Sequence, residues 1–98
     1  MTFNNLGTLF RQQGKYAEAQ NAYNKCLELK PDYAPAYNNL GLLYVALGAT
    51  FYSNALHMFQ MSHKMDSTLL AAKSNLARLK VIQEQEQEDD DEQDYDEL

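Results

Sequence analysis

Asparagine is the residue type whose placement in this chain points most clearly to chemistry. The pair Asn4-Asn5 returns as Asn38-Asn39, and Asn75 holds the corresponding place further along the chain. A side-chain amide carries a hydrogen-bond donor and an acceptor, so it can bind the backbone of an extended peptide without reading that peptide's side chains. Asparagine is not favoured inside helices by propensity and therefore needs another reason to be there. The column favours ligand contact; the alternative is that the amides hydrogen-bond locally between helices.

The other residue types that carry chemistry do not assemble into a catalytic or metal site. His57 and His63 are six residues apart on one predicted helix, so they point in different directions, and no Cys or acidic residue stands at ligand spacing beside them. Cys26 lies in an apolar stripe and is predicted to be a buried, inert thiol. A Gly-rich phosphate loop, a Ser/His/Asp set and paired carboxylates in a folded segment are all missing from the sequence. We therefore expect no enzymatic activity, no metal site and no cofactor.

The elements that position the asparagines follow from a repeat in the sequence. The segment Asn4-Asn5-Leu6-Gly7 returns as Asn38-Asn39-Leu40-Gly41, an offset of 34 residues from Asn4 to Asn38. A period of that length marks a unit that cannot bury its own apolar face and must stack on neighbours. Within each unit, apolar residues recur at three- and four-residue spacings, which is the helical period. The pattern predicts an all-α fold of five helices in antiparallel hairpins. They cover about residues 2–13, 16–29, 35–47, 50–65 and a fifth from about Thr68.

At these residues the chain resembles the tetratricopeptide repeat (TPR) family, whose repeat combines a large residue, Leu-Gly, an aromatic, a small residue, an aromatic, a small residue and a proline. The first repeat supplies these types in register as Phe3, Leu6, Gly7, Phe10, Ala19, Tyr23, Cys26 and Pro31. The second supplies Tyr37, Leu40, Gly41, Tyr44, Ala55, Phe59 and Ser62, with two extra residues within 48–53 and Ser67 at the proline position. A third begins with Asn75-Leu76-Ala77 and lacks its second helix.

The resemblance implies a TPR-like α-α superhelix, a right-handed solenoid of helical hairpins, over residues 1–82. Repeat 1 is expected at about 2–33, repeat 2 at about 34–67, and a third-repeat or capping helix from about 68. In this family the first helix of each pair lines a concave groove. The residues implied to contact a peptide there are Asn5, Thr8, Arg11, Gln12, Asn38, Asn39, Leu42, Asn75 and Arg78.

The resemblance thus indicates a protein–protein interaction scaffold that binds a peptide segment of a partner protein in its groove. Two alternatives stay open. The chain could be a non-catalytic fragment of a larger TPR-containing enzyme, for example a glycosyltransferase. It could also be a self-assembling structural unit that forms homo-oligomers through exposed solenoid ends.

Charge divides the chain into two regions. Residues 1–82 carry all eight basic residues against four acidic ones, a net charge of +4, whereas residues 83–98 carry ten acidic residues and no basic one. The second region has too few apolar groups to offset the entropy of ordering, so we expect an acidic, disordered tail. Such a tail can solubilise the chain, contact basic proteins or fold back on the domain's own basic body. The scattered basic residues argue against nucleic-acid binding.

The sequence also bears on location. It has no apolar run long enough to cross a bilayer and no readable signal peptide, so we expect no membrane association. The single cysteine and the lack of an Asn-x-Ser/Thr sequon favour a reducing compartment. We expect a cytoplasmic protein, with the nucleus as the alternative.

Overall fold

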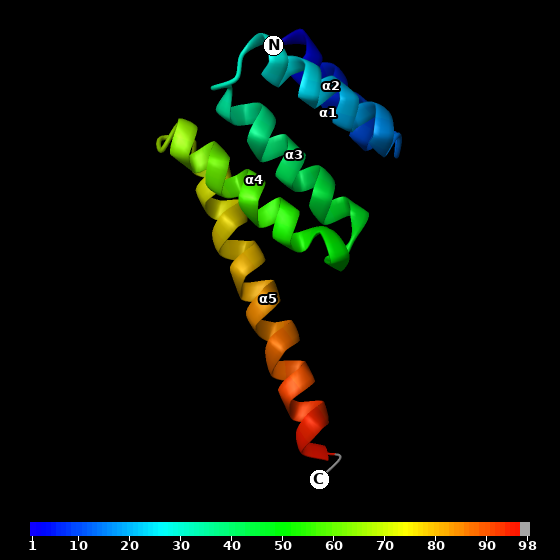
Figure 1. Ribbon diagram of the computed structural model, residues 1–98, viewed down its shortest axis with the longest axis vertical. Helices are drawn as coiled ribbons and strands as arrows, with labels where there is room; N and C mark the ends of the chain where they lie inside the picture. Colours follow the sequence, from blue (N-terminus) through cyan, green and yellow to red (C-terminus); the bar gives the residue numbers. More distant parts are fainter. Residues whose placement is uncertain (97–98) are drawn as a thin grey trace.

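The computed structural model describes the backbone of residues 1–96 and the side chains of residues 1–85. Over this range the chain forms α1 (Thr2–Gln12), α2 (Tyr16–Leu29), α3 (Ala34–Leu47), α4 (Tyr52–Met65) and α5 (Leu70–Asp96), with a short 3-10 helix, η1 (Ala49–Phe51), before α4. The helices α1 and α2 form one hairpin and α3 and α4 a second, α2 packs on α3, and α5 packs on α4 (Figure 1). The structure confirms the predicted all-α arrangement of five helices within the described residues.

Glycine and proline set the helix boundaries. Gly14 follows α1 with φ 77°, and Gly48 follows α3 with φ 119°. Both values lie in the region that residues with a Cβ rarely adopt, so glycine is favoured at these two turns. Pro31 comes just after α2, where it cannot continue the helix, and Pro35 occupies the first turn of α3, where its missing N–H costs nothing.

Each hairpin is closed by an aromatic ring that lies against a glycine of the facing helix. A Cβ built on Gly7 would lie 2.7 Å from two ring atoms of Tyr23, and one built on Gly41 would overlap the ring of Phe59. Tyr23 and Phe59 are almost fully buried, together with Ala19 and other small residues of the core. The absence of a side chain on the glycine therefore lets the ring of the second helix reach the backbone of the first.

Two apolar clusters join the units into one body. The first contains Ala19 and Tyr23 from α2 and Leu40 and Leu43 from α3, so it connects the first hairpin to the second. The second contains Ala55 and Phe59 from α4 and Leu79 from α5. Successive units thus share side chains, as the repeat period predicted.

The two extra residues of the second repeat lie in the connection between α3 and α4. Three residues of this connection form η1, and the ring of Phe51 stacks on that of Tyr44 with 6.1 Å between centroids. This aromatic contact holds the longer connection against the end of α3.

The last helix differs from the expectation at both ends. We expected it to begin near Thr68, but Asp66 Oδ1 accepts hydrogen bonds from the Thr68 N–H (3.0 Å) and hydroxyl (2.5 Å), and α5 begins at Leu70. These hydrogen bonds lower the pKa of the Asp66 carboxyl. At the other end, the backbone stays helical to Asp96, through most of the segment that we expected to be a disordered tail. Gln and Glu are good helix formers, and extending a packed helix needs no new nucleus. Residues 97–98 lie outside the described residues.

Replacing Gly7 by alanine tests the close helix crossing. Helix propensity alone would make this change stabilising by about 1 kcal/mol. Because the added methyl group would overlap the Tyr23 ring, we expect a net loss of about 1–3 kcal/mol in the free energy of unfolding, measured by urea denaturation. Ala77 holds the same repeat position in α5, where it is exposed, so Ala77→Gly is the matched control and should cost only the propensity term. A more stable Gly7→Ala variant would contradict the crossing.

Candidate functional site

The asparagines form a hydrogen-bonded ladder across the first helices of successive units. The Nδ2 of Asn39 in α3 donates to Oδ1 of Asn4 in α1 at 2.9 Å, and the Nδ2 of Asn75 in α5 donates to Oδ1 of Asn38 in α3 at 2.9 Å. The two acceptors are buried, with Asn4 8% and Asn38 7% exposed. Each rung therefore joins two helices that are far apart in the sequence but adjacent in space.

This arrangement changes the role that the sequence indicated for some asparagines. We expected Asn38 to contact a peptide, but its side chain is buried and its oxygen is engaged by Asn75. The side chains of Asn39 and Asn75 are half-buried and each donates to another asparagine, which is the alternative that sequence reasoning left open. Asn5 is exposed. The signal for the pairing was the doubled Asn-Asn, whose first member accepts and whose second member donates.

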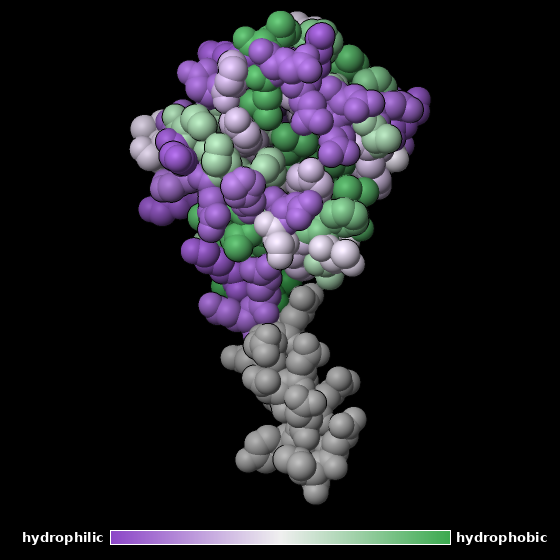
Figure 2. All heavy atoms as spheres, viewed as in Figure 1, coloured by the Kyte–Doolittle hydropathy of each residue, from purple (hydrophilic) through white to green (hydrophobic). Residues whose placement is uncertain are grey.

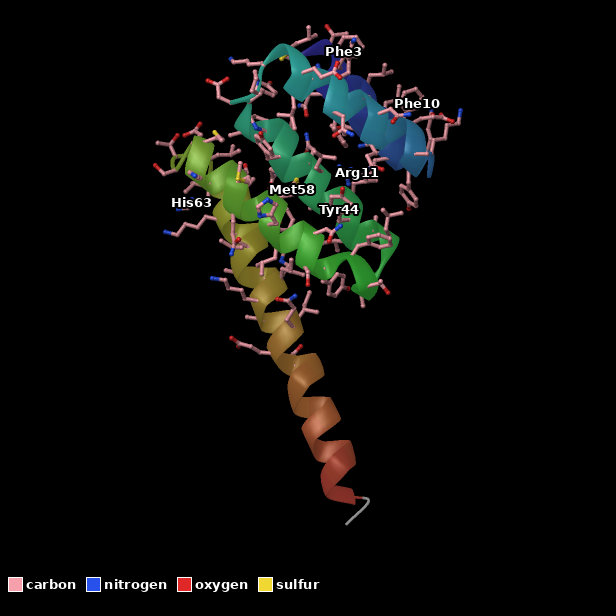
Figure 3. All side chains as sticks on the ribbon, viewed as in Figure 1. Phe3, Phe10, Arg11, Tyr44, Met58 and His63 are labelled. Atoms are coloured by element: carbon pink, nitrogen blue, oxygen red, sulfur yellow. The ribbon has the colours of Figure 1, made fainter. Side chains whose placement is uncertain are left out.

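The predicted residues at the first unit divide between the interior and the surface. Thr8 Oγ1 donates to the backbone oxygen of Asn4 at 3.2 Å and shares a 2.9 Å hydrogen bond with the Tyr23 hydroxyl, so this side chain is engaged inside the hairpin. Arg11 is half-buried, and its Nε is buried without a hydrogen-bond partner among the described residues. Figure 3 shows Arg11 and Tyr44 on the side where the first hairpin meets α3. Gln12 is exposed at the end of α1.

Between α3 and α5 the structure brings three of the predicted residues together around a small hollow of about 90 Å³. Its wall is apolar, and Asn75 and Arg78 contribute its polar groups. The lining residues are Leu42, Val45, Phe59, Asn75, Arg78, Leu79 and Ile82. Arg78 is exposed, so its guanidinium can meet a ligand without leaving a buried position. Sequence reasoning found Leu42, Asn75 and Arg78, but it did not find the apolar contributions of Phe59, Leu79 and Ile82.

Among the described side chains, neither Arg11 nor Arg78 forms an ion pair with a carboxylate. The ion pair found among residues 1–85 joins Lys25 and Glu28 at 3.5 Å, and both side chains are exposed. Burial raises the pKa of the Cys26 thiol, whose Sγ donates to Met1 Sδ at 3.5 Å.

Within the part of the chain that the structure describes, His, Cys, Asp and Glu do not gather into a group of three or more that could hold a metal ion. Among the described helices, none is long and apolar enough to cross a membrane.

A known family model matches the part of the chain that holds the first helix crossing and Asn39, the donor of the rung to Asn4. Residues 7–48 match the family model described as TPR repeat. This range begins at Gly7, covers α2 and α3, and ends at the turn residue Gly48. No curated protein matches the chain.

Removing one rung separates a structural role of the ladder from a ligand-binding role. Without any partner present, we expect Asn39→Ala to lower the free energy of unfolding by about 0.5–1.5 kcal/mol, because it removes a hydrogen bond and leaves buried Asn4 without its donor. Asn5→Ala is the matched control, because Asn5 has the same repeat position and is exposed; its effect should stay within about 0.5 kcal/mol. Urea denaturation measures both. Equal effects of the two changes would show that the rung adds no stability.

Proposed function

We propose that this chain, whose residues 7–48 are tetratricopeptide repeat sequence, binds a peptide segment of a partner protein along α1, α3 and α5, the first helices of its units. Repeats of this family generally mediate protein–protein interaction. The observation that carries the proposal for this chain is the hollow between α3 and α5. It combines an apolar wall from Leu42, Val45 and Ile82 with the polar groups of Asn75 and Arg78.

The size and lining of this hollow describe the peptide that fits it. A volume of about 90 Å³ accommodates one apolar side chain rather than a small-molecule ligand, for which pockets are typically about 300–1,000 Å³. The exposed guanidinium of Arg78 stands at the same place and can hold a carboxylate with two parallel hydrogen bonds. The peptide is therefore one in which an acidic residue neighbours a leucine- or isoleucine-like residue.

The ladder supports this function by fixing the spacing of the first helices before a ligand arrives. Because Asn75 belongs both to the ladder and to the hollow, the hydrogen bond to Asn38 orients its amide. A donated hydrogen bond uses one of the two N–H groups of an amide and leaves the oxygen able to accept. A surface that is ordered in advance loses less entropy on binding than a mobile one.

The net charge of residues 1–82 agrees with an acidic ligand. The region carries eight basic and four acidic residues. Its net charge of +4 favours an acidic peptide locally, whereas the ten acidic residues of 83–98 give the whole chain a net charge of −6. The proposed attraction therefore acts at short range around Arg78, and salt screens it.

A random peptide library displayed on phage, selected against the full chain, tests the proposal. We expect the enriched peptides to carry an acidic residue beside Leu or Ile. Arg78→Ala should weaken the binding of an enriched peptide about tenfold, because a hydrogen bond to a charged group contributes about 1.5–3 kcal/mol. Val45→Asp should abolish the binding of the peptide, because a carboxylate would occupy the wall of the hollow. Isothermal titration calorimetry measures each affinity.

Lys80→Ala is the matched control, because Lys80 is an exposed cation on the same helix and does not line the hollow. It should bind the peptide as the unchanged chain does. If Arg78→Ala and Lys80→Ala weaken binding equally, the interaction is a general attraction to positive charge and the proposed site is wrong. Enriched peptides without an apolar residue beside the acid would equally contradict it.

A further inference from the structure

The guanidinium group of Arg11 on α1 has an unused hydrogen-bond donor within the described part of the chain. Its Nε is buried without a partner, and the ion pair found among residues 1–85 joins Lys25 and Glu28 instead. The Tyr44 hydroxyl, which Figure 3 shows on the same side as Arg11, accepts a hydrogen bond from Gln20 Nε2 at 3.3 Å. A buried N–H without a partner costs free energy, so a ligand that draws the guanidinium out to an acceptor relieves this cost.

The repeat places Arg11 on the same side of the molecule as the proposed peptide site. Arg11 comes 34 residues before Val45, so the two residues hold the same position on neighbouring first helices. Val45 lines the hollow from α3, and Arg78 lines it from α5. The rung from Asn39 to Asn4 holds α3 beside α1. Arg11 and Arg78 therefore lie on either side of α3, with the wall of the hollow between them.

Arg11 and Arg78 are the two arginines of the sequence. A guanidinium binds a carboxylate through two parallel hydrogen bonds, which a lysine ammonium cannot do. Figure 2 shows hydrophilic residues interspersed with hydrophobic ones over the first four helices in this view. Such a surface suits a peptide that combines acidic and apolar side chains.

We propose that Arg11 is a second anchor for the peptide and binds a second acidic residue of it. This inference rests on the proposed function, in which Arg78 binds an acidic residue beside Leu or Ile. Helices that pack on each other are about 8–10 Å apart, so α1 and α5, which both contact α3, lie about 16–20 Å apart. An extended peptide advances about 3.3 Å per residue, so the two acidic residues are about five or six positions apart.

The charge of the chain beyond the hollow decides on which side the second acidic residue lies. Residues 83–98 contain ten acidic residues and no basic one, so a peptide carboxylate placed along this part of α5 meets like charge. Figure 1 shows the end of α5 pointing away from the first hairpin, so the chain's own acidic segment does not reach Arg11. The peptide segment that carries the second acidic residue therefore runs from the hollow toward α1.

Synthetic peptides test this spacing. Each carries an Asp-Leu pair and a second Asp at a varied distance on either side, with Gly and Ser at its other positions. Isothermal titration calorimetry with the full chain should give the highest affinity when the second Asp is about five or six positions away on one side. The gain over a peptide with a single Asp should be about fivefold, as expected for a partly exposed ion pair. Equal affinity at every distance would overturn the proposal.

Substitutions show whether the gain comes from Arg11. Arg11→Gln should remove the gain and leave the affinity for the single-Asp peptide unchanged, whereas Arg78→Ala should weaken the binding of both peptides. Arg11→Lys keeps the charge but lacks the planar group with its parallel donors, so it should keep part of the gain. Lys15→Ala is the matched control, because Lys15 is an exposed cation of the same hairpin that precedes α2, and it should keep the whole gain. If Arg11→Gln and Lys15→Ala behave alike, Arg11 is not an anchor.

The same measurements separate a failure of this inference from a failure of the proposed function. If the single-Asp peptide binds and depends on Arg78, but Arg11→Gln changes nothing, the second anchor is wrong and the proposed function stands. If neither peptide binds, or Arg78→Ala has no effect, both are wrong. Urea denaturation should give Arg11→Gln the midpoint of the unchanged chain. A large fall in midpoint together with the loss of both peptides would show that Arg11 supports the fold instead, and it would overturn the second anchor.

Discussion

The contact between an aromatic ring on the second helix of each hairpin and the bare backbone of a glycine on the first supports the rest of this structure. Tyr23 lies against Gly7 and Phe59 against Gly41. This contact sets how closely the two helices approach and thereby which side chains can meet. In the first hairpin it continues into a polar network. The Tyr23 hydroxyl bonds Thr8, and the Thr8 hydroxyl donates to the backbone oxygen of Asn4, whose side chain accepts from Asn39. The helix crossing is therefore linked through hydrogen bonds to the ladder.

The two repeats use the same crossing but differ in the polarity beside it, and this difference accounts for the candidate peptide site. Where the first hairpin has Tyr23 and Thr8, the second has Phe59 and Leu42, which cannot form the corresponding hydrogen bond. Phe59 and Leu42 instead form part of the apolar wall of the hollow, together with Val45, Leu79 and Ile82. In the third unit, Arg78 of α5 holds the same repeat position as Thr8 and Leu42, and it places a cation beside that wall. The second repeat thus has Phe59 and Leu42 at the two positions of Tyr23 and Thr8, and an apolar wall of the hollow replaces the polar contact inside the first hairpin.

Much of this architecture could be predicted from the sequence, because the repeat period and the helical spacing of apolar residues depend on local rules. The helices, the crossing glycines and the shared core around Tyr23 follow from those rules. The pairing of Asn39 with Asn4 could not be predicted in the same way. It depends on the shift between stacked units, which places the second asparagine of one unit opposite the first of the preceding unit. The burial of Asn38 follows from that shift.

The length of α5 could not be predicted from the local sequence either, because composition favours disorder in this segment whereas helix propensity favours a helix. Acidic, polar composition suggested disorder, whereas a helix already nucleated by packing on α4 extends at little cost through Gln and Glu. The start of the helix was displaced by the hydrogen bonds between Asp66 and Thr68. In both cases a tertiary or side-chain contact decided the boundary.

The ladder relates the proposed peptide site to the rest of the molecule. Its rung nearest α5 ends at Asn75, which also lines the hollow, and the other rung joins Asn39 of α3 to Asn4 of α1. The two rungs share no side chain, because Asn38 accepts in one and Asn39 donates in the other. Because each unit contacts chiefly its neighbours, a change in the rung between α1 and α3 is expected to leave the contacts between α3 and α5 unchanged. The proposed preference for an acidic residue beside an apolar one is therefore a property of Arg78 and the hollow beside it.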